Sequence, residues 1–167
     1  LENYLPMAED KAEVYYSLGN LFRAKGDNSK ASHYFKEAVK NRINHEDALF
    51  QLAMITEEEG SFDEILDFYQ EFIDQDPYSA GAWYNLGVVY NRLGRFEEAI
   101  KAYEYALIID DAFASAHFNM GNSLMNTQDF KGALEAYQNT INCEGANAEN
   151  CCYMGAAYEK LGKIDEA

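Results

Sequence analysis

The chain has 167 residues, of which 48% are hydrophobic, with two prolines and a formal net charge of −16. This hydrophobic content is enough for a buried core, so disorder is not expected, and the low proline count suits a mostly helical chain. An acidic chain repels a phosphate backbone, so we expect no nucleic-acid partner. The sequence holds no apolar run of the roughly 20 residues that a membrane helix needs, so we expect no membrane contact.

The first eleven residues, Leu1 to Lys11, do not share the pattern of the rest of the chain. We expect them to be the tail of an upstream helix or a linker. From Ala12 onward the sequence repeats at intervals of 34 residues, which predicts units over 12–45, 46–79, 80–113, 114–147 and a partial unit over 148–167.

Two columns of residues make the repetition visible. The first column is a Leu or Met followed by a small residue: Leu18-Gly19, Leu52-Ala53, Leu86-Gly87, Met120-Gly121 and Met154-Gly155. The second column is aromatic throughout: Phe35, Tyr69, Tyr103 and Tyr137. Repetition at several positions is a much stronger signal than any single motif.

The third unit shows most clearly why the pattern is helical. Apolar or small residues recur at helical spacing over 80–93 and again over 95–109, with Gly94 between the two segments. Each unit is therefore predicted to be two antiparallel helices joined by a tight turn. A Gly inside a helix costs about 1 kcal/mol relative to Ala, so Gly87 is expected to permit the close approach of a neighbouring helix.

The fourth unit departs from the others at its turn. Gln128 stands where the other units have Gly26, Gly60, Gly94 and Gly162. Its turn must either hold a left-handed residue without glycine or change shape.

The motif W-x2-L-G-x2-Y followed by A-x3-Y-x2-A resembles the tetratricopeptide repeat family. The residues that carry the match are Trp83, Leu86, Gly87, Tyr90, Ala99, Tyr103 and Ala106. This resemblance implies an all-α fold, a right-handed superhelical solenoid of stacked antiparallel helix hairpins. It also implies a non-enzymatic scaffold for protein–protein interaction.

In that family the first helix of each hairpin lines a concave surface on which ligands lie. The resemblance places an aromatic ladder there, Tyr16, Phe50, Tyr84 and Phe118, and an amide ladder beside it, Gln51, Asn85 and Asn119. Asn20 and Asn122 complete the candidate peptide-binding residues, and Ser115 and Glu149 also fall at inward positions. We expect the amides of Asn85 and Asn119 to be exposed and to pair with the backbone of an extended peptide or a partner helix. The alternative is that the inner aromatics simply pack on the next repeat.

The inward positions also predict the charge of the ligand. They hold six acids, Glu13, Asp47, Glu57, Glu58, Glu149 and Glu159, against three bases, Arg23, Arg92 and Lys160. Of the residues with which some family members grip a C-terminal carboxylate, only Asn20 is matched. We therefore expect a neutral or basic protein or peptide partner, not one with an acidic tail.

No constellation of residues predicts catalysis, a cofactor or a metal site. The three histidines, His33, His45 and His117, fall at different repeat positions, and His117 takes the place of Trp83 as a packing residue. Cys143, Cys151 and Cys152 lack metal-ligand spacing and do not form a disulfide framework. A reducing, cytoplasmic compartment is the simpler prediction.

Two further functions stay open. The chain begins with Leu1 and is expected to be a piece of a longer protein, so it could be a regulatory or targeting segment of a larger enzyme or assembly. Neither end carries a polar cap, so self-association through the uncapped ends is the other alternative.

Overall fold

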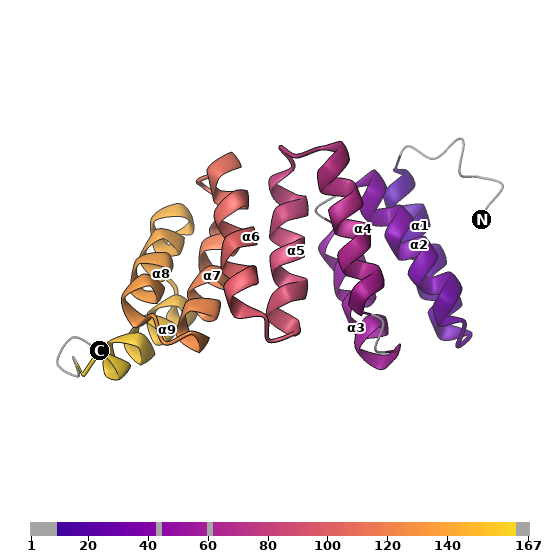
Figure 1. The fold of residues 1–167 in the computed structure, drawn as a ribbon. Coiled ribbons are helices and arrows are strands. Elements are labelled where there is room, and N and C mark those ends of the chain that lie inside the picture. Colours follow the sequence, from indigo (N-terminus) through magenta and orange to yellow (C-terminus); the bar gives the residue numbers. More distant parts are fainter. Residues whose placement is uncertain (1–9, 43–44, 60–61, 163–167) are drawn as a thin grey trace. The chain divides into compact units, whose positions relative to one another are not determined.

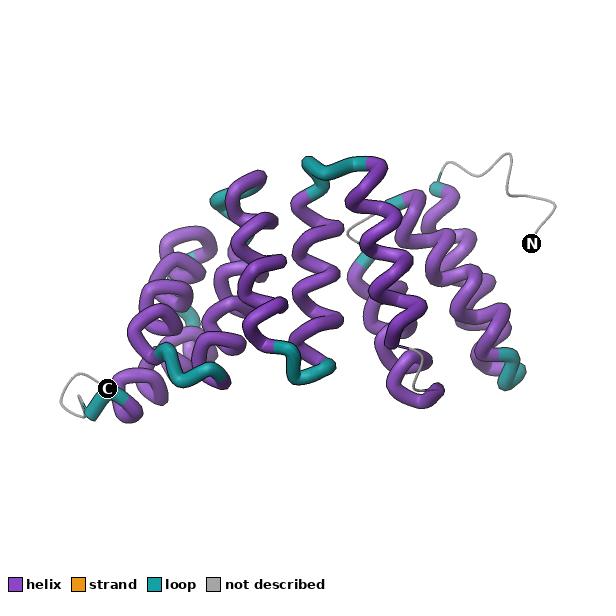
Figure 2. Tube along the Cα trace, in the orientation of Figure 1, coloured by secondary structure: helices purple, strands orange, loops and turns teal. Residues whose placement is uncertain are grey.

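The computed structural model describes residues 10–42, 45–59 and 62–162. Within these ranges the chain is made of helices joined by short loops, and no residue there is in a strand (Figure 2). The helices are α1 (Lys11–Ala24), α2 (Asn28–Asn41), α3 (Glu46–Glu59), α4 (Phe62–Gln75), α5 (Ala80–Arg92), α6 (Phe96–Ile109), α7 (Ala114–Asn126), α8 (Phe130–Glu144) and α9 (Ala148–Lys160).

The chain divides into two compact units, Leu1–Ile65 and Leu66–Ala167, with the division inside α4. In the first unit α1 packs against α2, and α2 packs against α3. In the second unit α5 pairs with α6 and α7 with α8 as antiparallel hairpins, while α6 contacts α7 and α8 contacts α9 (Figure 1). The expected all-α class and the antiparallel hairpins are confirmed.

The turns of three hairpins, α1–α2, α5–α6 and α7–α8, share one pattern of backbone hydrogen bonds. At the end of α5 the backbone N–H of Gly94 donates to the carbonyl of Asn91 at 3.0 Å, and that of Arg95 to the carbonyl of Tyr90 at 2.9 Å. Gly94 has a φ of +71°, the left-handed conformation that glycine adopts at little cost. This arrangement satisfies carbonyls that would otherwise be unpaired at the end of the helix.

The fourth hairpin keeps this turn without glycine. Gln128 has a φ of 65°, and its N–H donates to the carbonyl of Met125 at 3.2 Å, while that of Asp129 donates to the carbonyl of Leu124 at 2.9 Å. Of the two expected outcomes, the turn therefore holds its shape and Gln128 takes the strained conformation. For a residue with a Cβ this conformation costs roughly 1–2 kcal/mol.

The repeated glycine is where an aromatic ring of the second helix meets the first helix. A Cβ built on Gly87 would lie 2.6 Å from Cε1 of Tyr103, and one on Gly121 would lie 2.6 Å from Cε1 of Tyr137. Gly19 stands in the same relation to the ring of Phe35. The expectation of a close approach at Gly87 is confirmed, and what approaches is a side-chain ring.

The four rings of the repeated aromatic position are fully buried, and three of them belong to tyrosines: Phe35, Tyr69, Tyr103 and Tyr137. Burial raises the pKa of Tyr69, Tyr103 and Tyr137 above the usual value, because a phenolate would lose its hydration. Tyr137 donates its hydroxyl hydrogen to Oδ1 of Asn122 at 2.9 Å. The hydroxyl of Tyr69 has no hydrogen-bond partner among the described residues.

Parts of the sequence prediction fall outside what the structure describes. Residues 1–9, expected to be a linker or helix tail, and Gly60 lie outside the described residues, whereas α1 begins at Lys11, inside the predicted linker. The exact limits of the five repeats stay a prediction. Among the described residues, no helix is both long and apolar enough to cross a membrane.

Candidate functional site

The two predicted aromatic residues of the first unit differ in their surroundings. The ring centroid of Tyr16 lies 5.8 Å from that of Phe35 on α2 and 4.8 Å from that of His45, which precedes α3. Phe50 on α3 is 53% exposed. Tyr16 therefore serves the packing of the repeats, whereas Phe50 still presents apolar surface.

The predicted amide of the first unit is engaged within the molecule. Arg23 donates through Nη1 to the side-chain oxygen of Gln51, and through the same atom to its backbone carbonyl at 3.4 Å. Nη2 of Arg23 forms an ion pair with Oε1 of Glu58 at 3.1 Å. Asn20 is half-buried. An incoming peptide would have to displace Arg23 to reach the Gln51 carbonyl groups.

In the second unit the aromatic ladder also bridges successive hairpins. The ring centroid of Tyr84 lies 5.9 Å from that of Tyr103 in its own hairpin and 4.8 Å from that of Phe113, which precedes α7. Phe118 lies 5.0 Å from Tyr153 on α9 in an edge-to-face arrangement. Both rings are half-buried, so each keeps one part in the core and one part at the surface.

The amides of the second unit differ from one another more than the sequence suggested. Asn85 is only 2% exposed, so the expectation of an exposed amide there is wrong, because the side chain points into the packed interior. Asn119 is half-buried and donates through Nδ2 to the hydroxyl of Tyr84 at 3.0 Å. Asn122 accepts from the phenol of Tyr137. Of the two ladder amides in this unit, Asn119 is thus the one that reaches the surface.

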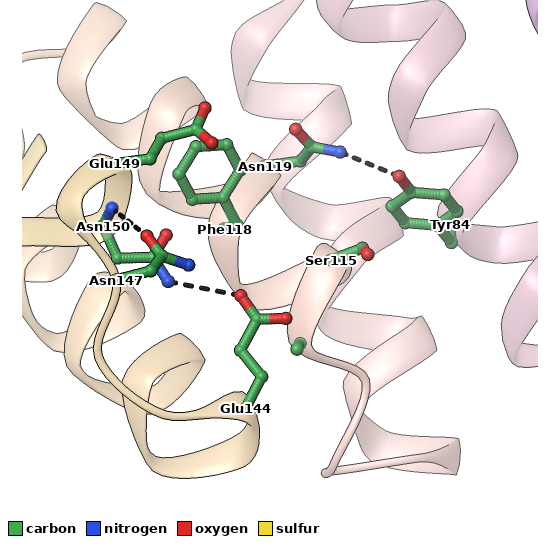
Figure 3. Close-up of a pocket in the computed structure, with 9 residues that line it drawn as sticks. Tyr84, Ser115, Phe118, Asn119, Glu144, Asn147, Glu149 and Asn150 are labelled. Carbon is green, nitrogen blue, oxygen red and sulfur yellow. Dashed lines mark hydrogen bonds between the residues drawn. The ribbon is translucent and has the colours of Figure 1, made fainter.

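A pocket of about 230 Å³ opens beside Asn119 within the second unit. It is lined by Tyr84, Ala114, Ser115, Phe118, Asn119, Glu144, Asn147, Glu149 and Asn150. Figure 3 shows Tyr84 and the α9 residues on opposite sides of this space, with side chains of α7 between them. The pocket therefore joins four helices of three successive repeats.

The polar groups around the pocket are held by local bonds. Asn147 is the N-cap of α9, and its Oδ1 accepts from the backbone N–H of Asn150 at 2.8 Å. Nδ2 of Asn150 donates to Oε1 of Glu144 at 3.2 Å, which ties the end of α8 to α9 (Figure 3). Asn150 is 3% exposed, whereas Glu144 and Glu149 are exposed. The pocket thus combines a fixed amide with two solvent-facing carboxylates.

Four of the nine residues that line the pocket were not predicted from the sequence. Tyr84, Phe118 and Asn119 were predicted as peptide-binding, and Ser115 and Glu149 as inward-facing. Ala114, Glu144, Asn147 and Asn150 were missed. Glu144 lies on a second helix, and the other three lie at the start of first helices but outside the positions that the resemblance turns inward. The N-cap preference for asparagine was the available signal, since it would have placed Asn147 at the start of α9.

The histidine and cysteine residues gather in no comparable site. Nε2 of His117 lies 2.9 Å from the carbonyl oxygen of Asp111, and Nε1 of Trp83 donates to that of Pro77 at 3.0 Å. The two rings thus bond to backbone carbonyls at equivalent positions of their repeats, each six residues earlier in the chain. This equivalence supports the packing role expected for His117. Among the described residues, no group of three histidine, cysteine or acidic side chains could hold a metal ion.

The folded units and the pocket define a helical-hairpin repeat protein with a polar pocket beside its first helices. A tetratricopeptide repeat profile matches residues 80–113, and a second profile of the same description matches 16–80. The chain belongs to the tetratricopeptide repeat family. A comparison with curated protein sequences gives no match.

Solved structures include several similar chains. A crystal structure of MamA protein superposes with a TM-score of 0.68 at 26% identity, over 95% of this chain and 87% of that one. The first TPR of Spaghetti (RPAP3), bound to the HSP90 peptide SRMEEVD, has a TM-score of 0.61 at 23% identity, over 68% and 90%. YrrB, described as a TPR protein with an unusual peptide-binding site, has a TM-score of 0.63 at 16% identity, over 99% and 85%. The last two likenesses concern the fold alone.

Proposed function

We propose that this chain is a non-enzymatic interaction module that holds an extended peptide of a partner protein on the first helices of its second unit. The pocket between α5, α7 and α9 is the observation that carries this proposal. We call the surface formed by Tyr84, Ser115, Phe118, Asn119 and Asn122 the first-helix face.

The first-helix face has the chemistry that an extended peptide needs. The half-buried rings of Tyr84 and Phe118 offer rigid apolar area at low cost in conformational entropy. A side-chain amide has two donor hydrogens and an acceptor oxygen, and Asn119 uses one donor on Tyr84. Its remaining groups can pair with a peptide backbone whatever the sequence of the peptide.

The charge around the pocket disfavours an acidic partner. Glu144 and Glu149 are the charged groups that line it, and both are negative. A peptide such as SRMEEVD, which the RPAP3 structure holds, would bring further carboxylates to this surface. Like charges repel, so the partner segment is expected to be neutral or basic, as the sequence predicted.

A selection with a random peptide library displayed on mRNA tests the function. We expect the unmodified chain to retain peptides that bind it in the micromolar range. Ser115→Trp is the blocking variant, because Ser115 is exposed and lines the pocket, so a large ring there fills the space without disturbing the core. It should lower the affinity of the chain for the selected peptides by about tenfold or more, which corresponds to about 1.4 kcal/mol of binding free energy.

Glu104→Trp is the matched control, because it adds the same ring at an exposed position of α6 outside the pocket. It should leave the affinity of the selected peptides unchanged in fluorescence anisotropy. If the library yields no binding peptide, or if Ser115→Trp leaves the affinity of the selected peptides unchanged, the first-helix face is not a peptide-binding surface.

A further inference from the structure

The pocket has an unbalanced set of charges. Its nine lining residues include two carboxylates, Glu144 and Glu149, and no cation. Glu144 comes from the C-terminal end of α8, and Glu149 from the first turn of α9. Glu144 is oriented by the hydrogen bond from Asn150, so its position does not depend on a ligand.

Helix dipoles act in the opposite direction but are weaker. The N-terminal ends of α7 and α9 border the pocket, and each carries a partial positive charge of about half an elementary charge. The N–H of Asn150 already donates to Asn147, and the N–H of Ala116 to the carbonyl of Phe113 at 2.9 Å. Two full negative charges exceed these partial charges, so the pocket favours a cation.

The pocket walls distinguish between kinds of cation. The half-buried rings of Tyr84 and Phe118 border the same space as the carboxylates. A guanidinium group is planar, stacks on aromatic faces and donates to carboxylates in a fork, whereas an ammonium is compact and strongly hydrated. Asn119 adds a side-chain oxygen that can accept from the same group.

We propose that this pocket binds an arginine side chain of the partner peptide, with Glu144 and Glu149 as its charge partners. The inference deepens the proposed function, since it names the side chain that the first-helix face selects. The guanidinium lies against the aromatic wall, and the peptide backbone continues along α5 and α7.

The test uses small probes, so that it does not depend on finding a peptide. N-acetylarginine amide is titrated into the isotope-labelled chain, and the side-chain amide signals of Asn119, Asn147 and Asn150 are followed by NMR. We expect saturable shifts in the millimolar range. N-acetylcitrulline amide, a neutral analogue of nearly the same shape, should bind about fivefold more weakly, because two exposed ion pairs each contribute modestly.

Paired variants show which carboxylates are responsible. Glu144→Gln combined with Glu149→Gln keeps an acceptor for Asn150 and should reduce arginine binding to the level of citrulline. Glu104→Gln combined with Glu135→Gln makes the same change in net charge at exposed positions outside the pocket and should preserve the difference.

Equal binding of the arginine and citrulline amides would overturn the inference, and so would an arginine preference that survives in the Glu144 and Glu149 double variant. Binding of N-acetyllysine amide as tight as that of the arginine amide would overturn the preference for guanidinium. These outcomes are separate from those of the peptide selection: library peptides that bind while the arginine amide does not would leave the proposed function standing.

Discussion

The contact between Gly87 and Tyr103 offers the sharpest test of how the hairpins are held together. An alanine Cβ at position 87 would lie 2.6 Å from Cε1 and 2.7 Å from Cδ1 of Tyr103. Carbon atoms in favourable contact are about 3.5–4.0 Å apart, so the ring or the helix would have to move by about 1 Å. Tyr103 is 0% exposed, so the ring has no adjacent solvent into which it can shift.

The magnitude follows from two opposing terms. Replacing Gly by Ala within a helix gains about 1 kcal/mol of helix propensity. Overpacking of a filled core costs about 1–3 kcal/mol. We therefore expect Gly87→Ala to lower the free energy of unfolding by up to about 2 kcal/mol.

Gly155→Ala is the matched control. A Cβ on Gly155 meets no atom of the described residues within 4 Å, so only the propensity term applies and the variant should be more stable than the parent. The difference between the two variants then isolates the overpacking term, about 1–3 kcal/mol. Urea unfolding followed by far-UV circular dichroism measures both variants, with the m-value as a check on cooperativity.

A double-mutant cycle identifies the ring as the cause. Tyr103→Leu removes the ring edge that the new Cβ would meet, so the two substitutions together should cost less than the sum of their separate effects. If Gly87→Ala is as stable as Gly155→Ala, with an unchanged m-value, the close approach of ring and helix does not limit packing.

Three further predictions concern the turn and the buried phenols. Gln128→Gly should raise the free energy of unfolding by about 1 kcal/mol in the same urea assay, because it relieves the left-handed strain. Tyr69→Phe should raise it by about 1 kcal/mol and Tyr137→Phe should lower it by a similar amount, because only the second removes a hydrogen bond, that to Asn122. The raised pKa values of Tyr69, Tyr103 and Tyr137 mean that stability is complete below pH 10.0, the ordinary pKa of tyrosine, and falls as the pH rises above it. In an alkaline titration, part of the phenolate absorbance should therefore appear only together with the loss of helical signal, and its appearance before unfolding would contradict the burial of these groups.

The sequence alone was sufficient to predict the all-α class, the hairpins and the glycine contact. These features depend on local periodicity and on a column of small residues, which repeat in the chain and can be compared with one another. Even the strained conformation of Gln128 could be anticipated, because the other units have glycine at the equivalent position.

The candidate site depended on tertiary contacts that no column of the repeat displays. Asn85 and Asn119 occupy the same repeat position, yet one is buried and the other reaches the surface. The pocket also needed Glu144 and Asn150, which belong to different helices and meet across the loop between α8 and α9, a pairing that the 34-residue period does not display. Periodicity fixes which face of a helix turns inward, but the burial of each side chain is decided by the particular neighbours that pack against it.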